Sequence, residues 1–535
     1  MISPRHILLA GLCLAWILPG LIGHDPWKPD EAYTFGVVYE LLNGGSWIVP
    51  HLAGEVFLHE PPLFHMTAAA SARLFSPLLP LHDAARLVSG FYMALTFLFC
   101  ALAARELNGP RYGTVAALLL LGCFGLVLRS HQLIADVAAL CGFVIAHYGL
   151  ALALRRPASG GAWLGAGTGI VFMTQGPLES AILVVLALLL PIVPAWRTRP
   201  YALALAIALV VATPLFVVWP WLLYKESSAL FAEWLWTNNL GRLTADIEQG
   251  LTYYARILPW YAWPVWAIAL WTLWRARMTG FVRPAVALPV LSFLVTLTML
   301  SFAPEVRELY ALPLLVPLTL LATPTATALR RGAANAWYWF SIMGFTFFVL
   351  VAWFYWSGLE LGLPARLHAH LHRMQPGYEP GFKSLPFFLG ALYTLAWLAA
   401  LGALRRSPER PLYTWAAGIS TVWALLAILF VGYINTGKSY RSMVLALEQA
   451  LPPKHRCISS RELGESQRAM LHYYAGLITY RDEVETRRRN CDLMLVQGHP
   501  RQETSPGRNW RKIWEGGRPG DKDERYRLYQ RTARH

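Results

Sequence analysis

Long apolar runs, separated by short basic segments, limit what this chain can fold into more than any other feature. The chain has 535 residues, of which 56% are hydrophobic and only 14% are charged, whereas a soluble domain has about 25% charged residues. A run of about 20 apolar residues crosses a bilayer, and in lipid it must be a helix because its backbone groups have to bond internally. The sequence therefore predicts a polytopic α-helical membrane protein with about 13 transmembrane helices, near 7–22, 84–104, 112–128, 136–154, 162–176, 178–195, 201–223, 256–274, 284–302, 309–328, 337–356, 385–404 and 412–434.

Arginine-bearing loops predict the orientation of these helices. Every second loop carries arginine, and the positive-inside rule places such loops in the cytoplasm. The N-terminus is then cytoplasmic, and an odd number of spans puts the C-terminus on the outer side. The loops contain Arg105 and Arg111, Arg155 and Arg156, Arg197 and Arg199, Arg275 and Arg277, Arg330 and Arg331, and Arg405, Arg406 and Arg410.

The basic balance of the chain has the same explanation. Its net charge of +15 comes from these clusters and from the tail, which is a pattern of membrane topology and not of a nucleic-acid groove. We therefore expect no nucleic-acid partner. The first apolar run, 7–22, has no small-residue cleavage site after it, so we expect a retained span and not a signal peptide.

Two long outer loops, near 23–83 and 225–256, interrupt the predicted membrane domain, which covers 1–435. Both loops are rich in Trp and Tyr, and neither is apolar enough to span. Each contains apolar residues at helical spacing, which predicts an amphipathic helix lying in the membrane interface. These residues are Tyr33, Phe35, Val38, Tyr39 and Leu42 in the first loop, and Phe231, Trp234, Leu235 and Leu240 in the second.

Residues 436–535 are polar and basic, and they predict a small α/β domain outside the membrane. We expect helices over 440–451 and 463–474, strands over 456–459 and 493–497, and two further short strands. Its charge is typical of a solvated surface, and contact with anionic lipid is the alternative. Cys457 and Cys491 each begin a predicted strand, so they form either a disulfide or two free thiols. No Cys-x-x-Cys spacing indicates a metal site.

Three segments at the outer side carry the candidate chemistry. Asp30 and Glu31 follow Pro29 in the first loop, the segment 58–63 reads Leu-His-Glu-Pro-Pro-Leu, and Asp136 opens the fourth span. Taken singly, the acidic residues fit the first turn of a helix. Together they place carboxylates beside several cations, namely Lys28, Arg129 and Arg242. A carboxylate can deprotonate an attacking hydroxyl, and cations can hold a lipid-linked phosphate.

At these segments the sequence resembles the GT-C glycosyltransferases, in particular the 4-amino-4-deoxy-arabinose lipid A transferase group and its protein O-mannosyltransferase relatives. Asp30-Glu31 matches the acidic pair of the family's first outer loop, and Asp136 matches its second outer-loop acid. Residues 58–63 lie where the family has Glu-Lys-Pro-Pro-Leu, and 236–242 resembles its Asn-Asn-x-Gly-Arg segment. Arg307 and Tyr310 resemble the start of a late span. The resemblance covers about 1–320, and the topology fits to about 435.

The resemblance implies an inverting glycosyltransferase of the bacterial inner membrane. Its donor would be a sugar on undecaprenyl phosphate, and its acceptor lipid A or another envelope glycan or lipid. Asp30 would be the base, with Glu31 and Asp136 orienting or assisting it. The donor phosphate would be held by Lys28, His59, Arg129, Arg242, Arg307 and Tyr310. The resemblance implies membrane lipids as surroundings, a monomer, and neither a metal nor a cofactor.

Four departures from the family pattern keep other interpretations open. Glu60 stands where the family has a lysine, Gln175 replaces the lysine of a Lys-Gly-Pro motif, and Tyr33 replaces an arginine. Residues 248–250 read Glu-Gln-Gly where relatives have a histidine. One alternative is an inactive paralogue of the transferases. The other is a transporter or lipid flippase, which would place its polar residues nearer the bilayer midplane.

Overall fold

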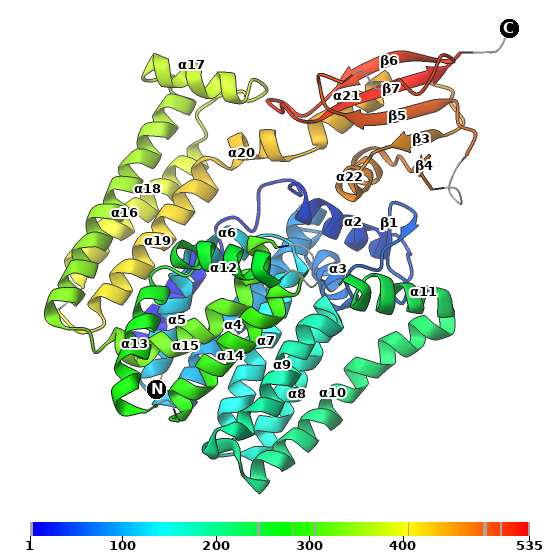
Figure 1. Cartoon of the computed structure of the whole chain (residues 1–535). Helices are drawn as coiled ribbons and strands as arrows, with labels where there is room; N and C mark the ends of the chain where they lie inside the picture. Colours follow the sequence, from blue (N-terminus) through cyan, green and yellow to red (C-terminus); the bar gives the residue numbers. More distant parts are fainter. Residues whose placement is uncertain are drawn as a thin grey trace.

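Apolar helices form the body of the molecule, and a small domain covers one end of them (Figure 1). The structure is a computed structural model that describes residues 4–242, 247–280, 282–303, 306–404, 406–484, 489–502 and 505–532. Within this part, eight segments are long and apolar enough to cross a membrane, which makes the chain a polytopic helical membrane protein. They are α4 (Leu81–Asn108), α7 (Ala135–Leu152), α10 (Arg199–Glu226), α14 (Pro284–Ser301), η5 (Glu308–Leu314) running into α15 (Leu315–Ala326), α16 (Arg331–Glu360), α18 (Ser384–Ala403) and α19 (Arg410–Leu429).

The other predicted spans are also helical, but they are shorter, divided or, at 157–175, less apolar. Pro264, which lacks a backbone donor, lies between two helices where one span was expected over 256–274. The helices are α1 (Pro4–Ile17), α5 (Tyr112–Leu121), α6 (Phe124–Arg129), α8 (Pro157–Gln175), α9 (Pro177–Leu189), α12 (Ile247–Tyr261) and α13 (Val265–Thr279). Each of the predicted ranges therefore overlaps at least one helix.

Small residues allow α7, α8 and α10 to pack at short distance. A Cβ added at Gly161 of α8 would lie 2.3 Å from the carbonyl oxygen of Ala204 in α10. On its other side, a Cβ added at Gly167 would lie 2.5 Å from the backbone of Ala146 in α7. Close backbone approach through small residues is the usual means of joining helices in lipid, where burial from water contributes little. This packing fixes the outer ends of α7 and α8, from which cavity residues come.

The first outer loop folds into α2 (Asp30–Leu42), a hairpin of β1 (His51–Leu52) and β2 (Glu55–Val56), and α3 (Leu63–Phe75). The prediction that α2 lies in the membrane interface is wrong. Phe35 and Val38 are fully buried, and a Cβ added at Gly36 would lie 2.5 Å from the Cβ of Ala469. The apolar face of α2 therefore packs inside the protein, between the helix bundle and the C-terminal domain.

The second outer loop contains α11 (Ser228–Ala232), a π-helical turn η3 (Glu233–Thr237) and η4 (Leu240–Arg242). Trp234 is 2% exposed and packs edge-on against Trp219 of α10. Trp236 is 60% exposed, so this short segment has one face toward the bundle and one away from it. The expected continuous amphipathic helix is thus replaced by three short turns.

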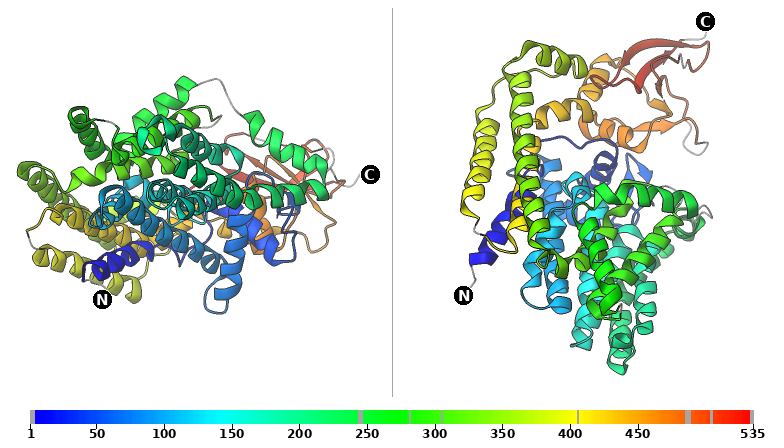
Figure 2. Two further views of the ribbon diagram at one scale, coloured as in Figure 1. Left: turned by 90° about the horizontal axis from the view of Figure 1, so that it is seen from below. Right: turned by 60° about the vertical axis from the view of Figure 1, so that its left-hand side comes forward.

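The C-terminal domain is an α/β fold at the end of the bundle opposite the N-terminus, as the turned view also shows (Figures 1 and 2). Its five-stranded sheet has the order β4-β3-β5-β7-β6, with β3 parallel to β4 and β5 and the remaining pairs antiparallel. The predicted helices and strands agree with the structure, except that β4 was not expected. The elements are α20 (Val431–Lys438), α21 (Arg441–Ala450), β3 (Ile458–Arg461), α22 (Glu465–Ala475), β4 (Thr479–Arg481), β5 (Leu493–Gly498), β6 (Trp510–Gly516) and β7 (Arg525–Arg531), with α17 (Ala365–Met374) nearby at the same end.

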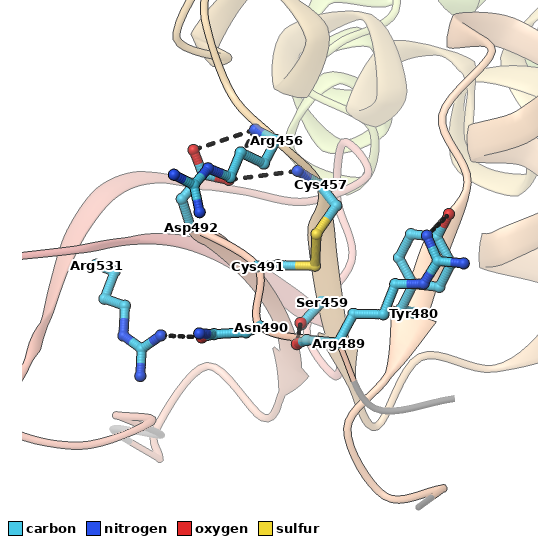
Figure 3. The surroundings of a disulfide bond; sticks show 9 residues. All are labelled: Arg456, Cys457, Ser459, Tyr480, Arg489, Asn490, Cys491, Asp492 and Arg531. Atoms are coloured by element: carbon cyan, nitrogen blue, oxygen red, sulfur yellow. Dashed lines mark hydrogen bonds between the residues drawn. A yellow bond between two sulfur atoms is a disulfide. The ribbon is translucent and has the colours of Figure 1, made fainter. Parts of the chain in front are cut away.

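A disulfide joins Cys457 and Cys491, which the sequence left open between a bond and two thiols (Figure 3). Their Cα atoms are 5.0 Å apart, because β3 and β5 are parallel neighbours that begin at the same edge. Asp492 accepts hydrogen bonds from the backbone N–H groups of Arg456 and Cys457. The bond thus ties the first strand of the sheet to its central strand.

Replacing both cysteines by serine should lower the unfolding free energy of this domain by about 3–4 kcal/mol. The bond closes a loop of 34 residues, and closure of such a loop restricts the unfolded chain. Pulse proteolysis of the full-length protein in urea measures the change. Dithiothreitol should weaken the wild-type domain and leave the double variant unaffected, whereas equal resistance of all samples would contradict the prediction.

Candidate active site

A cavity of about 480 Å³ opens among the ends of the helices beneath the C-terminal domain. Residues from α2, α7, α9, α14, η5 and α22 contribute to its wall. Its acidic and basic lining is mainly acidic and consists of Glu60, Asp136, Glu179, Glu465, His59 and Arg307. Ionisable groups at this depth are costly unless they are used, so this cavity is the candidate site.

Asp30 lies beside this cavity, between two arginines. The first turn of α2 begins after Pro29 and carries Asp30, whose residue is 3% exposed. The Nη2 atom of Arg307 donates to both carboxylate oxygens, at 2.7 and 3.0 Å. Arg129 lies 3.5 Å from the same carboxylate and also pairs with Glu308. The structure therefore brings together three residues that the sequence proposed separately.

Glu31 points away from this cavity, although it is the neighbour of Asp30. Its Oε1 accepts hydrogen bonds from Arg86 and from the backbone N–H of Leu133, both at 2.8 Å. Burial by itself would raise the pKa of Glu31, but Arg86 and His24 outweigh it and hold the pKa below its usual range. Glu31 fixes the N-terminal segment to α4 and to the loop before α7, which suits a positioning role.

Glu60 and Tyr33 form the side of the cavity where the family pattern has cations. The Tyr33 hydroxyl donates to Glu60 Oε1 at 3.4 Å. Burial, together with the carboxylates of Asp136 and Asp30, raises the pKa of Glu60 well above its usual range. Burial and the same acidic surroundings also raise the pKa of Tyr33. Tyr33 therefore stays a neutral hydroxyl at neutral pH, and Glu60 keeps its proton to higher pH than an ordinary carboxyl does.

The remaining predicted phosphate ligands occupy different places. Tyr310 lines the cavity, and its ring centre is 5.9 Å from the guanidinium carbon of Arg307. His59 is on the rim, 3.3 Å from Glu465 of α22. Lys28 is outside this cavity and lies 3.5 Å from Asp521 and 3.4 Å from Glu524 in the C-terminal domain. The side chain of Arg242 lies outside the described residues.

A second cavity, also of about 480 Å³, lies between α2 and the C-terminal domain. It shares Tyr33, Arg307 and Glu465 with the first cavity, and Asp30 and Lys28 line it. Asp30 itself lines the second cavity, and Arg307, to which it is bound, lines both. This arrangement allows two substrates to approach one carboxylate from different sides.

Sequence reasoning missed two contributors to the site. Glu179 lines the cavity from the first turn of α9, and a carboxylate at the start of an apolar run was the signal for it. Arg86 of α4 is 1% exposed and holds Glu31, but an arginine at the start of a predicted span reads as ordinary flanking charge. Nothing in the local sequence pairs it with a residue 55 positions earlier.

Comparisons with known proteins agree with the resemblance and with the fold. No family model matches the chain. An undecaprenyl phosphate-α-4-amino-4-deoxy-L-arabinose arabinosyl transferase of Pseudomonas savastanoi pv. phaseolicola is 26% identical over 440 residues, which cover 79% of this chain and 76% of the relative. The transferase of the same name from Serratia proteamaculans is 24% identical over 478 residues, covering 86% and 80%.

The solved structures show the same architecture over the whole molecule. The crystal structure of ArnT from Cupriavidus metallidurans bound to undecaprenyl phosphate superposes with a TM-score of 0.71 at 16% identity, and covers 99% of this chain and 98% of that one. The apo state of the same protein gives a TM-score of 0.70. The similarity thus includes the C-terminal domain, which has little motif content. The chain is thus similar in sequence to undecaprenyl phosphate-linked aminoarabinose transferases over about four fifths of its length, and it shares the fold of ArnT.

Proposed function

We propose that this protein transfers a sugar from undecaprenyl phosphate to lipid A at the outer face of the bacterial inner membrane. The observation that carries the proposal is the buried carboxylate of Asp30 between Arg307 and Arg129, beside the two cavities that Arg307 lines. The named relatives act on an undecaprenyl phosphate-linked aminoarabinose. A transferase needs a base, a cation for phosphate and room for two substrates, and this site has all three.

The donor sugar is placed in the first cavity. Arg307 and Tyr310 line it, and so do the acidic residues Asp136, Glu179 and Glu60. A phosphate that enters beside Arg307 competes with Asp30 for the guanidinium group, since both are anionic acceptors of charge-assisted hydrogen bonds. The carboxyl groups of Asp136 and Glu179 attract a positively charged amine. This combination favours an amino sugar such as the one in the names of the relatives.

The transfer step follows from the position of Asp30. A hydroxyl or phosphate oxygen of the acceptor attacks the anomeric carbon as its proton passes to Asp30, which acts as general base. The bond from that carbon to the phosphate oxygen breaks, and undecaprenyl phosphate leaves with the electron pair. One direct displacement inverts the anomeric centre. Asp136 orients the sugar from the first turn of α7.

The membrane arrangement belongs to the same proposal. We place the N-terminus in the cytoplasm and the C-terminal domain in the periplasm, with about 13 spans and a monomeric chain. The arginine-bearing loops support this orientation. In addition, the N-terminus and the C-terminal domain lie at opposite ends of the bundle (Figure 1). The cavities then face the periplasm, where no nucleotide donor is needed.

Mass spectrometry of lipid A, after incubation with the purified protein in liposomes, tests the function. The donor is undecaprenyl phosphate-linked 4-amino-4-deoxy-L-arabinose, and the expected product is lipid A heavier by one aminopentose. A flippase would move the donor across the membrane and leave lipid A unmodified. An inactive paralogue would leave the donor both intact and on its original leaflet.

Replacing Arg307 by methionine should raise the KM for the donor about tenfold to hundredfold. A charge-assisted hydrogen bond contributes about 1.5–3 kcal/mol, and each 1.4 kcal/mol is tenfold in affinity. Arg307→Lys keeps the charge but loses the two-oxygen geometry, so it should fall between methionine and wild type. Initial rates at varied donor concentration measure the effect. An unchanged KM in both variants would remove Arg307 from the donor site.

A further inference from the structure

The most unusual group in the first cavity is the carboxyl of Glu60. Glu60 precedes Pro61 and Pro62, so its backbone is restricted to extended conformations and the following helix, α3, starts at once. Its side chain lines the cavity together with Asp136 and Arg307. It therefore occupies a rigid position at the wall where we place the donor phosphate and sugar.

Buried partners hold this carboxyl from behind. Its Oε2 lies 3.6 Å from Nε2 of His65, which is fully buried in α3. Within the described residues, this Oε2 is buried and makes no hydrogen bond. Its Oε1 accepts from the Tyr33 hydroxyl at 3.4 Å. His65 does not line the cavity, and among the described residues its ring nitrogens have no hydrogen-bond partner.

The charges around Glu60 favour its protonated form. Apart from His65 and Tyr33, the titratable groups that act on Glu60 are the carboxylates of Asp136, Asp30 and Glu465. The basic residues Arg307 and His59 line the same cavity. Burial raises the pKa of Glu60, and the three carboxylates raise it further, against the hydrogen bond from Tyr33. Burial also lowers the pKa of His65 to about 4. Both shifts favour the form of this pair in which the proton is on the carboxyl and the imidazole is neutral.

We propose that Glu60 is the general acid of the transfer reaction and that it protonates the departing undecaprenyl phosphate. The inference rests on the proposed function. As the bond between the anomeric carbon and the phosphate oxygen breaks, the electron pair stays on the phosphate. The Glu60 proton then passes to a phosphate oxygen, and the Tyr33 hydroxyl and His65 stabilise the resulting carboxylate.

The protons balance in this step. Asp30 gains the proton of the acceptor while Glu60 loses one, and both return to their starting states by exchange with water in the cavity. A phosphate monoester has a second pKa of about 6, so the departing phosphate develops a second negative charge, and a proton donated while the bond breaks reduces that charge in the transition state. A cation would give the same stabilisation without proton transfer, and the resembled motif carries lysine at this position. Glu60 thus supplies a transferable proton where the resembled motif supplies the fixed positive charge of a lysine.

Three variants of the full-length protein in liposomes test the proposal, with undecaprenyl phosphate-linked aminoarabinose and lipid A as substrates. Glu60→Gln keeps the shape but has no transferable proton, and Glu60→Lys supplies a charge. The matched control is Glu106→Gln, a carboxylate that pairs with Arg155 at 3.6 Å, far from the cavity. The kcat is measured against pH, and the melting temperature of each variant in detergent reports on its folding.

The expected result is a kcat about a hundredfold lower for Glu60→Gln, since general acids contribute about 10²–10⁴. Wild-type kcat should fall on the alkaline side as Glu60 loses its proton, and this fall should be absent from both Glu60 variants. Glu60→Lys should be faster than Glu60→Gln, and Glu106→Gln should match wild type.

Two results would overturn the role of Glu60 while the transferase function stands. One is a Glu60→Gln protein that keeps the wild-type kcat and alkaline fall. The other is a Glu60→Lys protein that folds but is slower than Glu60→Gln with a raised KM, which would mean that Glu60 binds the sugar amine. An inactive wild-type protein has a different meaning, because then the proposed function itself fails.

Discussion

Replacing Asp30 by asparagine is expected to lower the transfer rate about a thousandfold and to leave the fold intact. A positioned general base contributes about 10²–10⁴, and asparagine cannot accept a proton. Its amide oxygen still accepts from Arg307, which lies 2.7 Å from the carboxylate in the native protein. The rate is measured as aminopentose added to lipid A, both in liposomes and in cells whose own copy of the gene is deleted.

A matched variant separates loss of the base from loss of an ion pair. Asp482→Asn removes a carboxylate that binds Arg461 at 2.7 Å in the C-terminal domain, and it should transfer sugar at the wild-type rate. If Asp30→Asn restores lipid A modification as well as wild type does, Asp30 is only an acidic residue in the first turn of α2. Its effect would then be on the helix dipole, worth about 0.3–1 kcal/mol.

The sequence predicted the carboxylates and cations of the site because their position along the chain determines their side of the membrane. Asp30, Asp136, Arg129 and Arg307 all follow or precede predicted spans at the outer end. Arginine in alternate loops predicts which end that is. Once the helices pack, residues at one end of a bundle lie within a small area. Residues that are far apart in the sequence could therefore still be assigned to the same site.

The role of each residue in the site was not predictable, because it depends on the direction of the side chain and on partners that are distant in the sequence. Asp30 and Glu31 are adjacent in a helix, so they point about 100° apart, and only one can face a given cavity. Which one does so is set by Arg86 on α4 and by the cover of α22 over α2. The close contact of Gly36 with Ala469 joins segments more than 400 residues apart. An isolated α2 has the pattern of an interfacial helix, and this contact converts it into an internal one.

Replacing Arg86 by methionine should destabilise the whole protein by about 3–5 kcal/mol, because breaking a buried pair leaves uncompensated charges. Arg86 is 1% exposed and donates to Glu31 and Asp83 at 2.8 and 2.6 Å. It also donates to the backbone carbonyls of Leu21 and His24. Thermal unfolding in detergent measures the loss, and the protein yield from membranes should fall with it.

A second substitution distinguishes this charge effect from simple loss of packing. Glu31→Gln added to Arg86→Met removes one of the stranded charges, so the double variant should be more stable than the sum of the single losses predicts. The pH dependence has a definite sign. Since Arg86 and His24 depress the pKa of Glu31 against the effect of burial, the wild-type protein should lose stability as the pH falls through that lowered pKa. Glu31→Gln should remove this part of the acid sensitivity. If the single losses simply add, the two residues are not coupled, and the buried cluster does not hold the first outer loop in the position that directs Asp30 toward Arg307.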